Sequence, residues 1–125
     1  MNILITGGAG YIGYSLVDHL LRNDNGQHSI KIFDNLSRKN FGLFAMADFR
    51  NKPIEFIQGD ILDGRKLRSA LDGIDCVVHL AAKVTTPYAD HDAHFFDQVN
   101  HWGSASVALA IEASKVKRCV CLSSI

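Results

Sequence analysis

The sequence has few of the residues that mark disulfide-stapled, membrane-spanning or nucleic-acid-binding chains. Its 125 residues include only three cysteines, two prolines and one tryptophan, and 13 basic side chains balance 13 acidic ones. Three cysteines without metal-ligand spacing argue against a disulfide framework or a zinc site, so we expect free, buried thiols at Cys76, Cys119 and Cys121. Because no basic excess is present, neither nucleic acid nor an anionic membrane is an expected partner.

Long apolar runs are also missing. No stretch of about eighteen consecutive apolar residues occurs, which argues against a transmembrane helix. No basic leader with a cleavage site precedes the first apolar segment, and this predicts a cytoplasmic protein. The length fits a single domain over residues 1–125, in which the 47% of hydrophobic residues can form a core.

The most informative segment that is present is the glycine-rich run Thr6-Gly7-Gly8-Ala9-Gly10-Tyr11-Ile12-Gly13. It follows an apolar triplet and precedes a helical pattern, which is the strand, turn and helix context of a dinucleotide-binding fingerprint. One glycine turns the chain off the strand, a second lets the backbone approach a pyrophosphate, and a third lets the helix lie close to the sheet. Two registers of the fingerprint fit these glycines: one uses Gly7, Gly10 and Gly13, and the other uses Gly8, Gly10 and Gly13. A strand that ends at Thr6 favours the first.

Strand and helix patterns alternate along the whole chain. We expect strands at 2–6, 29–33, 54–58, 75–80 and 118–123, a short helical stretch within 41–49, and helices at 11–22, 63–71 and 92–115. This alternation predicts an α/β fold, a Rossmann-type doubly wound parallel sheet with strand order 3-2-1-4-5. Ligands of such sheets bind at the carboxyl ends of the strands.

Hydrophobic periodicity predicts which helix faces are buried. The helix at 11–22 is expected to turn Ile12, Leu16, Leu20 and Leu21 toward the sheet. Asp63 is expected to cap the helix at 63–71, whose buried residues would be Leu67, Ala70 and Leu71.

Asp34 ends the second predicted strand, 21 positions after Gly13. A carboxylate at this place can accept hydrogen bonds from the hydroxyls of an adenosine ribose and repels a 2′-phosphate, although a strand-end turn aspartate is the plainer interpretation. Arg38 and Lys39 follow, and they could hold such a phosphate or serve only as solvated loop charges. The spacing favours a ribose contact by Asp34.

Polar or small residues also follow the third and fourth predicted strands. Asp60 could bond an adenine amino group while Ile61 packs on the ring, or Asp60 could serve only as a turn residue. His79 is interpreted as a packed histidine, and the small residues after it leave room for a flat cofactor. Lys83 lies near the mouth of this crevice or is simply an exposed loop residue.

The segment Asp90-His91-Asp92-Ala93-His94 has the residue types of a metal site. It lies at a predicted helix start, where aspartate is favoured as a cap, and we therefore expect no metal. His101 and Trp102 are expected to be surface and packing residues of that helix.

Taken together, these segments resemble the extended short-chain dehydrogenase/reductase family, in its nucleotide-sugar epimerase and dehydratase branch. The resemblance covers the whole chain and rests on six segments in the family's order: the glycine-rich run, Asp34-Asn35-Leu36-Ser37, Gly59-Asp60-Ile61, His79-Leu80-Ala81-Ala82, Val99-Asn100 followed by Gly103-Ser104, and Leu122-Ser123-Ser124. It implies NAD as cofactor and a nucleotide sugar as substrate.

The resemblance also implies roles for individual residues. The glycine turn with Tyr11 and Ile12 would hold the pyrophosphate, and Asn100 would support the site from behind. Ser124, or alternatively Ser123, would bond the reacting sugar oxygen. The remaining cofactor contacts would come from Asp34, Asn35, Ser37, Asp60, Ile61, Leu80, Ala81, Ala82 and Lys83.

The family's proton-transferring tyrosine and lysine pair has no counterpart in this chain, and Tyr11, Tyr14 and Tyr88 lack the lysine four residues later. We therefore expect residues 1–125 to be the N-terminal portion of the NAD-binding domain, truncated after the fifth strand and inactive alone. A homodimer is possible through the long helix or the unpaired fifth strand. An NADP-dependent reductase of the same family and a non-catalytic NAD-binding module stay open as alternatives.

Overall fold

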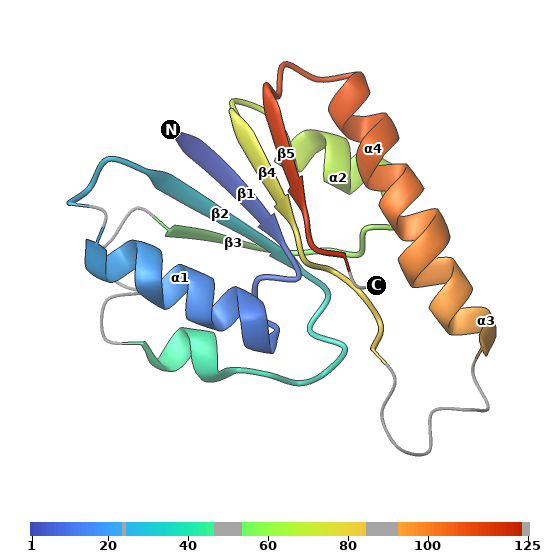
Figure 1. Cartoon of the computed structure of the whole chain (residues 1–125), viewed down its shortest axis with the longest axis horizontal. Helices are drawn as coiled ribbons and strands as arrows, with labels where there is room; N and C mark the ends of the chain where they lie inside the picture. Colours follow the sequence, from blue (N-terminus) through green and yellow to red (C-terminus); the bar gives the residue numbers. More distant parts are fainter. Residues whose placement is uncertain (24, 47–53, 85–92, 124–125) are drawn as a thin grey trace.

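The computed structural model describes residues 1–23, 25–46, 54–84 and 93–123. Its centre is a five-stranded sheet in the order β3-β2-β1-β4-β5, with every neighbouring pair parallel (Figure 1). This confirms the predicted strand order. The strands are β1 (Asn2–Thr6), β2 (Ser29–Asp34), β3 (Ile54–Gln58), β4 (Cys76–His79) and β5 (Arg118–Cys121).

Helices cover both faces of the sheet, as a doubly wound fold requires (Figure 1). On one face lie α1 (Tyr11–Asn23) and the short 3-10 helix η1 (Gly42–Ala45). The other face carries α2 (Gly64–Ala70) and the C-terminal helix, which consists of α3 (Ala93–Phe96), the π-helical segment η3 (Asp97–Gly103) and α4 (Ser104–Glu112).

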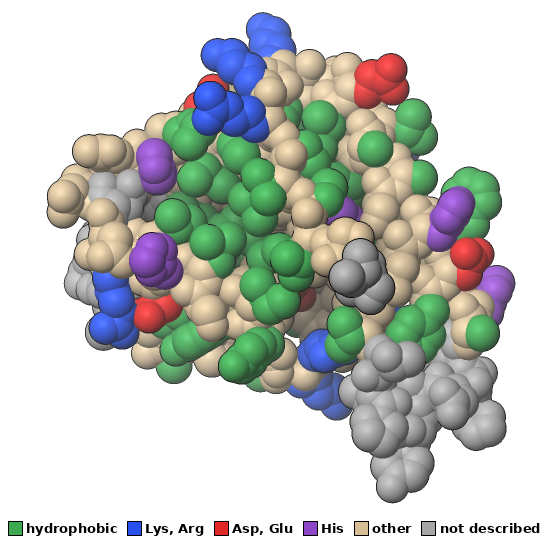
Figure 2. All heavy atoms as spheres, viewed as in Figure 1, with side chains coloured by type: hydrophobic (Ala, Val, Ile, Leu, Met, Phe, Trp, Pro, Cys, Tyr) green, Lys and Arg blue, Asp and Glu red, His purple; other side chains and the backbone are tan. Residues whose placement is uncertain are grey.

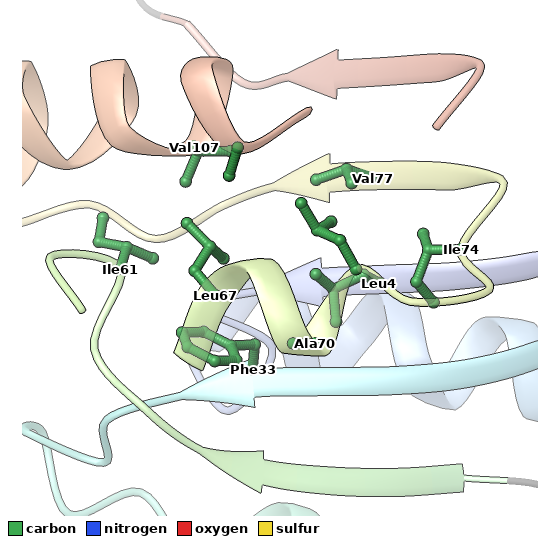
Figure 3. Close-up of a cluster of buried hydrophobic side chains, with 10 residues drawn as sticks. Leu4, Phe33, Ile61, Leu67, Ala70, Ile74, Val77 and Val107 are labelled. Atoms are coloured by element: carbon green, nitrogen blue, oxygen red, sulfur yellow. The ribbon is translucent and has the colours of Figure 1, made fainter. Parts of the chain in front are cut away.

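The alternation of side chains along each strand divides the core in two. Leu4 packs with Leu67 of α2 and Val107 of α4, as Figure 3 shows, whereas Ile3 and Ile5 pack with Val17 of α1. Fully burying one such aliphatic side chain stabilises a fold by about 1.5–3 kcal/mol. The strands are therefore held between two apolar layers, and their carboxyl ends are fixed in relation to both.

The buried face of α1 differs from the prediction at one residue. Ile12 was expected to face the sheet, but it is 50% exposed, while Val17 is fully buried. The first turn of the helix begins directly after the glycine turn, where Gly13 makes the close contact with the chain beneath it. Leu21 is buried as expected, and Leu16 and Leu20 are partly buried against the same cluster.

The other helices follow the prediction in outline. Asp63 caps α2, because its Oδ1 accepts a hydrogen bond of 3.1 Å from Lys66 N, and the predicted residues Leu67, Ala70 and Leu71 are buried. The C-terminal helix ends at Glu112, earlier than expected, because Ser114 Oγ donates to Ile111 O at 2.7 Å and accepts from Val116 N at 3.1 Å. Asp92, where the C-terminal helix was expected to start, lies outside the described residues. The same is true of residues 47–49 of the helical stretch expected within 41–49.

The prediction that all three cysteines are buried is wrong for two of them. All three are free thiols, but only Cys76 is buried, whereas Cys119 and Cys121 are exposed. The physical reason is that β5 forms the edge of the sheet, where every residue of the strand is exposed. Their Sγ atoms lie 3.6 Å apart, and partial desolvation of the Cys119 thiol by its neighbours, together with its contact to Cys121, raises the pKa of Cys119 to about 11. Within the described part of the chain, no helix is long and apolar enough to cross a membrane.

Candidate functional site: a dinucleotide crevice at the strand ends

The glycine turn leaves β1 through Gly7, whose φ of +71° lies in the left-handed region. Gly7 N donates to Phe33 O of β2 at 2.9 Å, and Gly10 N donates back to Gly7 O at 3.0 Å. A Cβ on Gly7 would lie 2.6 Å from Ala81 N and 2.7 Å from Ala81 Cα, inside the backbone that extends β4. Only glycine satisfies both the dihedral angle and the space, which makes Gly7 the turn glycine of the favoured register.

The other glycines of the turn have distinct surroundings. A Cβ on Gly13 would lie 2.5 Å from Gly8 Cα, and one on Gly8 would lie 2.6 Å from Ile32 Cγ2, so both glycines are needed for packing. A Cβ on Gly10 would meet only Gly7 O, at 3.1 Å. Gly10 is therefore the least crowded of these glycines, and it lies next to the first turn of α1, where Tyr11 is 88% exposed. The unpaired N–H groups of such a helix start attract phosphate.

Asp34 connects the end of β2 to this turn. Its Oδ2 accepts from Ala9 N at 3.0 Å, and its Oδ1 accepts from Leu36 N at 2.8 Å. The second contact holds Leu36 in the left-handed region, with φ of 58°. The turn role weighed for Asp34 is thus present, and the same contacts place a half-buried carboxylate directly beside the glycine turn. Each oxygen keeps a free lone pair for a further donor.

Asp60 and Asn35 form a second polar contact beyond Asp34. Asn35 Nδ2 donates to Asp60 Oδ2 at 3.0 Å, and Asp60 Oδ1 accepts from Leu62 N at 2.9 Å, so Asp60 also serves as a turn residue. Asn35 Oδ1 accepts from Ser37 N at 3.0 Å. The side chain of Ile61 is only 5% exposed and packs against Gly103, so a ligand at this place would meet mainly its backbone.

The segment after β4 is attached to the C-terminal helix. Asn100 Oδ1 accepts from Lys83 N at 2.7 Å, and Asn100 Nδ2 donates to Lys83 O at 2.9 Å, so the amide is fully engaged by one residue's backbone. The Lys83 ammonium lies 4.5 Å above the centre of the Phe95 ring. Leu80 and Ala81 are half-buried and Ala82 is exposed, so little side-chain bulk projects above this strand end.

His79 is the buried titratable group beneath the crevice. Its Nδ1 lies 2.7 Å from Thr6 Oγ1 and its Nε2 lies 3.0 Å from Ser104 Oγ. The ring is 7% exposed, and burial lowers its pKa from the usual value. The expectation of a packed histidine is therefore confirmed, and the two hydroxyl partners were not foreseen.

The lowered pKa of His79 predicts an acid-sensitive fold. The free energy of unfolding should have its full value above about pH 6.5 and should fall as the pH drops below that point. The reason is that His79 of the unfolded chain then binds a proton, whereas His79 of the folded chain does not. Each unit of depression contributes about 1.4 kcal/mol. Urea unfolding at a series of pH values should show a shallower acid slope for His79→Gln. The exposed His101→Gln serves as the control, and equal slopes for His79→Gln and the unchanged chain would contradict the assignment.

Two of the predicted sites cannot be placed. Ser124 and the segment Asp90-His91-Asp92 lie outside the described residues, and the alternative Ser123 is exposed just after β5. In the described ranges, no group of three or more His, Cys, Asp or Glu side chains could hold a metal ion. His101 lies on the exposed surface of the helix as expected, whereas Trp102, for which packing was expected, is 58% exposed.

The fold and the glycine turn define a Rossmann-type domain of the extended short-chain dehydrogenase/reductase class. The model of the 3-beta hydroxysteroid dehydrogenase/isomerase family matches residues 4–125, and the chain belongs to this family. The chain is 34% identical to a UDP-N-acetylglucosamine 4,6-dehydratase (inverting) of Campylobacter jejuni, over 98% of the chain and 36% of that protein. The resemblance to the nucleotide-sugar epimerase and dehydratase branch is thereby confirmed.

Solved structures agree with this assignment. UDP-glucose-4-epimerase from Stenotrophomonas maltophila, solved with bound NAD and formylated UDP-arabinopyranose, matches with a TM-score of 0.84 and 28% identity over 99% of this chain and 37% of that one. The dTDP-glucose 4,6-dehydratase DesIV from Streptomyces venezuelae, with NAD and TYD bound, matches with a TM-score of 0.83 and 29% identity over 95% of this chain and 38% of that one. The chain spans a little over a third of the length of these relatives.

Proposed function

We propose that residues 1–125 form the N-terminal part of the NAD-binding domain of a longer, cytoplasmic enzyme that epimerises or dehydrates a nucleotide-activated sugar. The observation that carries the proposal is the 3.0 Å hydrogen bond from Ala9 N to Asp34 Oδ2. It brings the carboxylate suited to a ribose and the turn suited to a pyrophosphate into one site. Relatives of both kinds, an epimerase and a dehydratase, are solved with NAD bound.

The residues of the turn fit the phosphates of NAD. Gly10 leaves open space on the outer side of the turn, and the exposed start of α1 at Tyr11 and Ile12 offers unpaired N–H groups. Gly7 and Gly13 keep the turn and the helix close to the sheet. In this proposal they bind the pyrophosphate without any cationic side chain.

The adenosine half of NAD would lie over the ends of β2 and β3. Asp34 accepts hydrogen bonds from the ribose hydroxyls through its free lone pairs, assisted by Asn35 and Ser37. Asp60 and the backbone of Ile61 lie beside the adenine. The negative charge of Asp34 disfavours the 2′-phosphate of NADP.

The nicotinamide half would pass over Leu80, Ala81 and Ala82 toward Lys83, whose backbone Asn100 holds in place. NAD, when bound, would supply a hydride acceptor for the carbon that bears the reacting sugar hydroxyl. The chain's own residues bind and orient the cofactor, and Ser124, or alternatively Ser123, would hydrogen-bond the sugar oxygen. A tyrosine and lysine pair for proton transfer would have to come from beyond residue 125, so we expect the chain to be inactive alone.

A second candidate is an NADP-dependent reductase, and the match to the 3-beta hydroxysteroid dehydrogenase/isomerase family favours a steroid as its substrate. Arg38 and Lys39 would then face a 2′-phosphate. A relative affinity that favours NADP over NAD would support this candidate, whereas NAD preference supports the first. A non-catalytic NAD-binding module would share the binding properties and differ only in lacking turnover at full length.

The proposal is tested by adding NAD to the 15N-labelled chain and recording amide shifts. Large changes should cluster at Gly7–Gly13, Asp34–Ser37, Asp60–Ile61 and Leu80–Lys83. The amides around the hollow at the opposite end of the sheet, including Gly73 and Lys115, should not move. Shifts that are absent or confined to that opposite end would overturn the proposed NAD site.

We also propose that the chain self-associates through β5. Among the described residues, β5 is the last strand of the sheet and has a neighbouring strand on one side only, and Val120 and Leu122 are 55% and 61% exposed. Figure 2 shows that hydrophobic side chains gather over the strands on the face it views. Sedimentation should show dimers that Val120→Lys converts to monomers. Leu109→Lys, on the exposed side of α4, should leave the dimer intact. A chain that stays monomeric at high concentration would contradict β5 as the contact. A dimer that Leu109→Lys dissociates and Val120→Lys does not would contradict it as well.

A further inference from the structure

A line of buried polar groups runs beneath the crevice and connects three elements. Thr6 Oγ1, at the end of β1, lies 2.7 Å from His79 Nδ1, and His79 Nε2 lies 3.0 Å from the hydroxyl of Ser104, the first residue of α4. Thr6 is fully buried, and its Oγ1 also accepts from Ala81 N at 3.5 Å. None of these side chains has a place in the cofactor contacts proposed above.

The surrounding hydrogen bonds favour one position for the proton on the His79 ring. Ala81 N–H donates to Thr6 Oγ1, so the Thr6 hydroxyl can donate its own proton to His79 Nδ1. The proton of a neutral ring then lies on Nε2 and is donated to Ser104 Oγ. In the opposite tautomer, His79 Nδ1–H and Ala81 N–H would both donate to Thr6 Oγ1, and the buried Thr6 hydroxyl proton would have no acceptor among these groups, which is unfavourable.

The line ends at a crowded part of the turn. Thr6 immediately precedes Gly7, and Ala81 is the residue whose backbone a Cβ on Gly7 would strike. Because these two backbones approach so closely, we expect a shift of Ala81 to be felt at Gly7. The same helix that provides Ser104 also holds Lys83 through Asn100, so the β4 extension is attached to it on both sides of Ala81.

From this geometry we infer that His79 is a positioning residue of the nucleotide site: as the Nε2–H tautomer it fastens α4 to the ends of β1 and β4 and thereby fixes Ala81 against the glycine turn. The inference that this affects a nucleotide rests on the proposed function. The tautomer and the attachment do not depend on it. His79 acts through Thr6 and Ala81 and does not itself touch the ligand.

The first test is a long-range 1H–15N correlation spectrum of the histidine rings at neutral pH. It should show His79 as a neutral ring with the proton on Nε2, and Thr6→Val, which removes the hydroxyl donor, should lower the share of that tautomer. A neutral ring protonated on Nδ1, or a charged ring, would overturn the inference. This readout separates a specific hydrogen-bonding role from simple filling of the core.

The second test compares Ser104→Ala with Ser106→Ala. Ser106 is the matched control, because its hydroxyl lies on the same helix but only donates to Trp102 O. Ser104→Ala should shift the amides of Ala81 and Gly7 in the chain without NAD and should weaken NAD binding about five- to tenfold, which is about 1–1.4 kcal/mol. Ser106→Ala should leave the amide shifts unchanged and the affinity within twofold.

The two proposals can fail separately. If the Ala81 and Gly7 amides respond equally weakly to both serine variants, His79 is not a positioning residue, whatever the affinity for NAD. If the tautomer and the amide shifts are as expected but the unchanged chain binds no NAD, the attachment stands and the proposed function fails. If NAD binds and Ser104→Ala leaves its affinity unchanged, the nucleotide part of the inference is overturned.

Discussion

Replacing Gly7 by alanine is expected to lower the free energy of unfolding by about 3 kcal/mol, the largest effect of any single substitution in the turn. A left-handed φ such as the +71° of Gly7 costs an alanine about 1–2 kcal/mol. The new Cβ would also lie 2.6 Å from Ala81 N and 2.8 Å from Leu80 C, and forcing these backbones apart costs about 1–3 kcal/mol more. The midpoint temperature of thermal unfolding should fall by about 10 °C.

Gly73→Ala is the matched control for this prediction. Gly73 has nearly the same dihedral angle, with φ of +70°, but nothing lies within 4 Å of its added Cβ. It should therefore lose only the conformational part, about 1 kcal/mol. If urea unfolding gives the same loss for both variants, the close approach of Gly7 to the β4 extension is not a constraint on the fold.

Asp34→Asn is expected to have the largest effect on cofactor choice. It should weaken NAD binding by about tenfold or more, because a hydrogen bond to a charged acceptor is worth about 1.5–3 kcal/mol. It also replaces one carboxylate oxygen by an NH2 group that cannot accept a hydrogen bond, so the side chain can no longer accept from both Ala9 N and Leu36 N. Since the repulsion of a 2′-phosphate disappears with the charge, NADP should lose much less affinity than NAD.

Calorimetric titration of the variant with both cofactors checks this second prediction. Asp18→Asn is the control, because Asp18 carries the same charge on α1 but pairs only with Arg22 on the exposed side of the helix. It should change neither affinity by more than about twofold. An Asp34→Asn variant with an unchanged ratio of NAD to NADP affinity would remove Asp34 from the ribose site.

The strand order could be predicted from the sequence because it depends on patterns longer than any one residue. Alternating strands and helices impose parallel pairing with right-handed crossovers, and the glycine turn at Gly7 marks where the first strand must lie. The structure has the same order. The cap at Asp63 was equally predictable, because a capping side chain acts within its own turn.

Features that depend on contacts between distant segments could not be predicted in this way. The rotation of α1 that buries Val17 and exposes Ile12 follows from the packing of Gly13 on the glycine turn. The exposure of Cys119 and Cys121 follows from the position of β5 at the sheet edge, since the apolar run alone is equally compatible with a buried strand.

The polar contacts of the site were foreseen only in part. The sequence placed Asp34 and Asp60 near the same strand ends, but it gave no indication that their carboxylates hold Ala9, Leu36 and Leu62 through the backbone. His79 was recognised as packed, while its partners Thr6 and Ser104 are 73 and 25 positions away in the chain. Such pairs become visible only when the fold brings them together.

The central claim is that the glycine turn and Asp34 form a site for NAD, and calorimetric titration of the unchanged chain with NAD and then with NADP tests it most directly. We expect one NAD per chain with clear preference over NADP, and much weaker binding by Gly10→Ala, whose added Cβ would meet Gly7 O at 3.1 Å. No heat of binding with either cofactor, tighter binding of NADP, or full affinity in Gly10→Ala would contradict it.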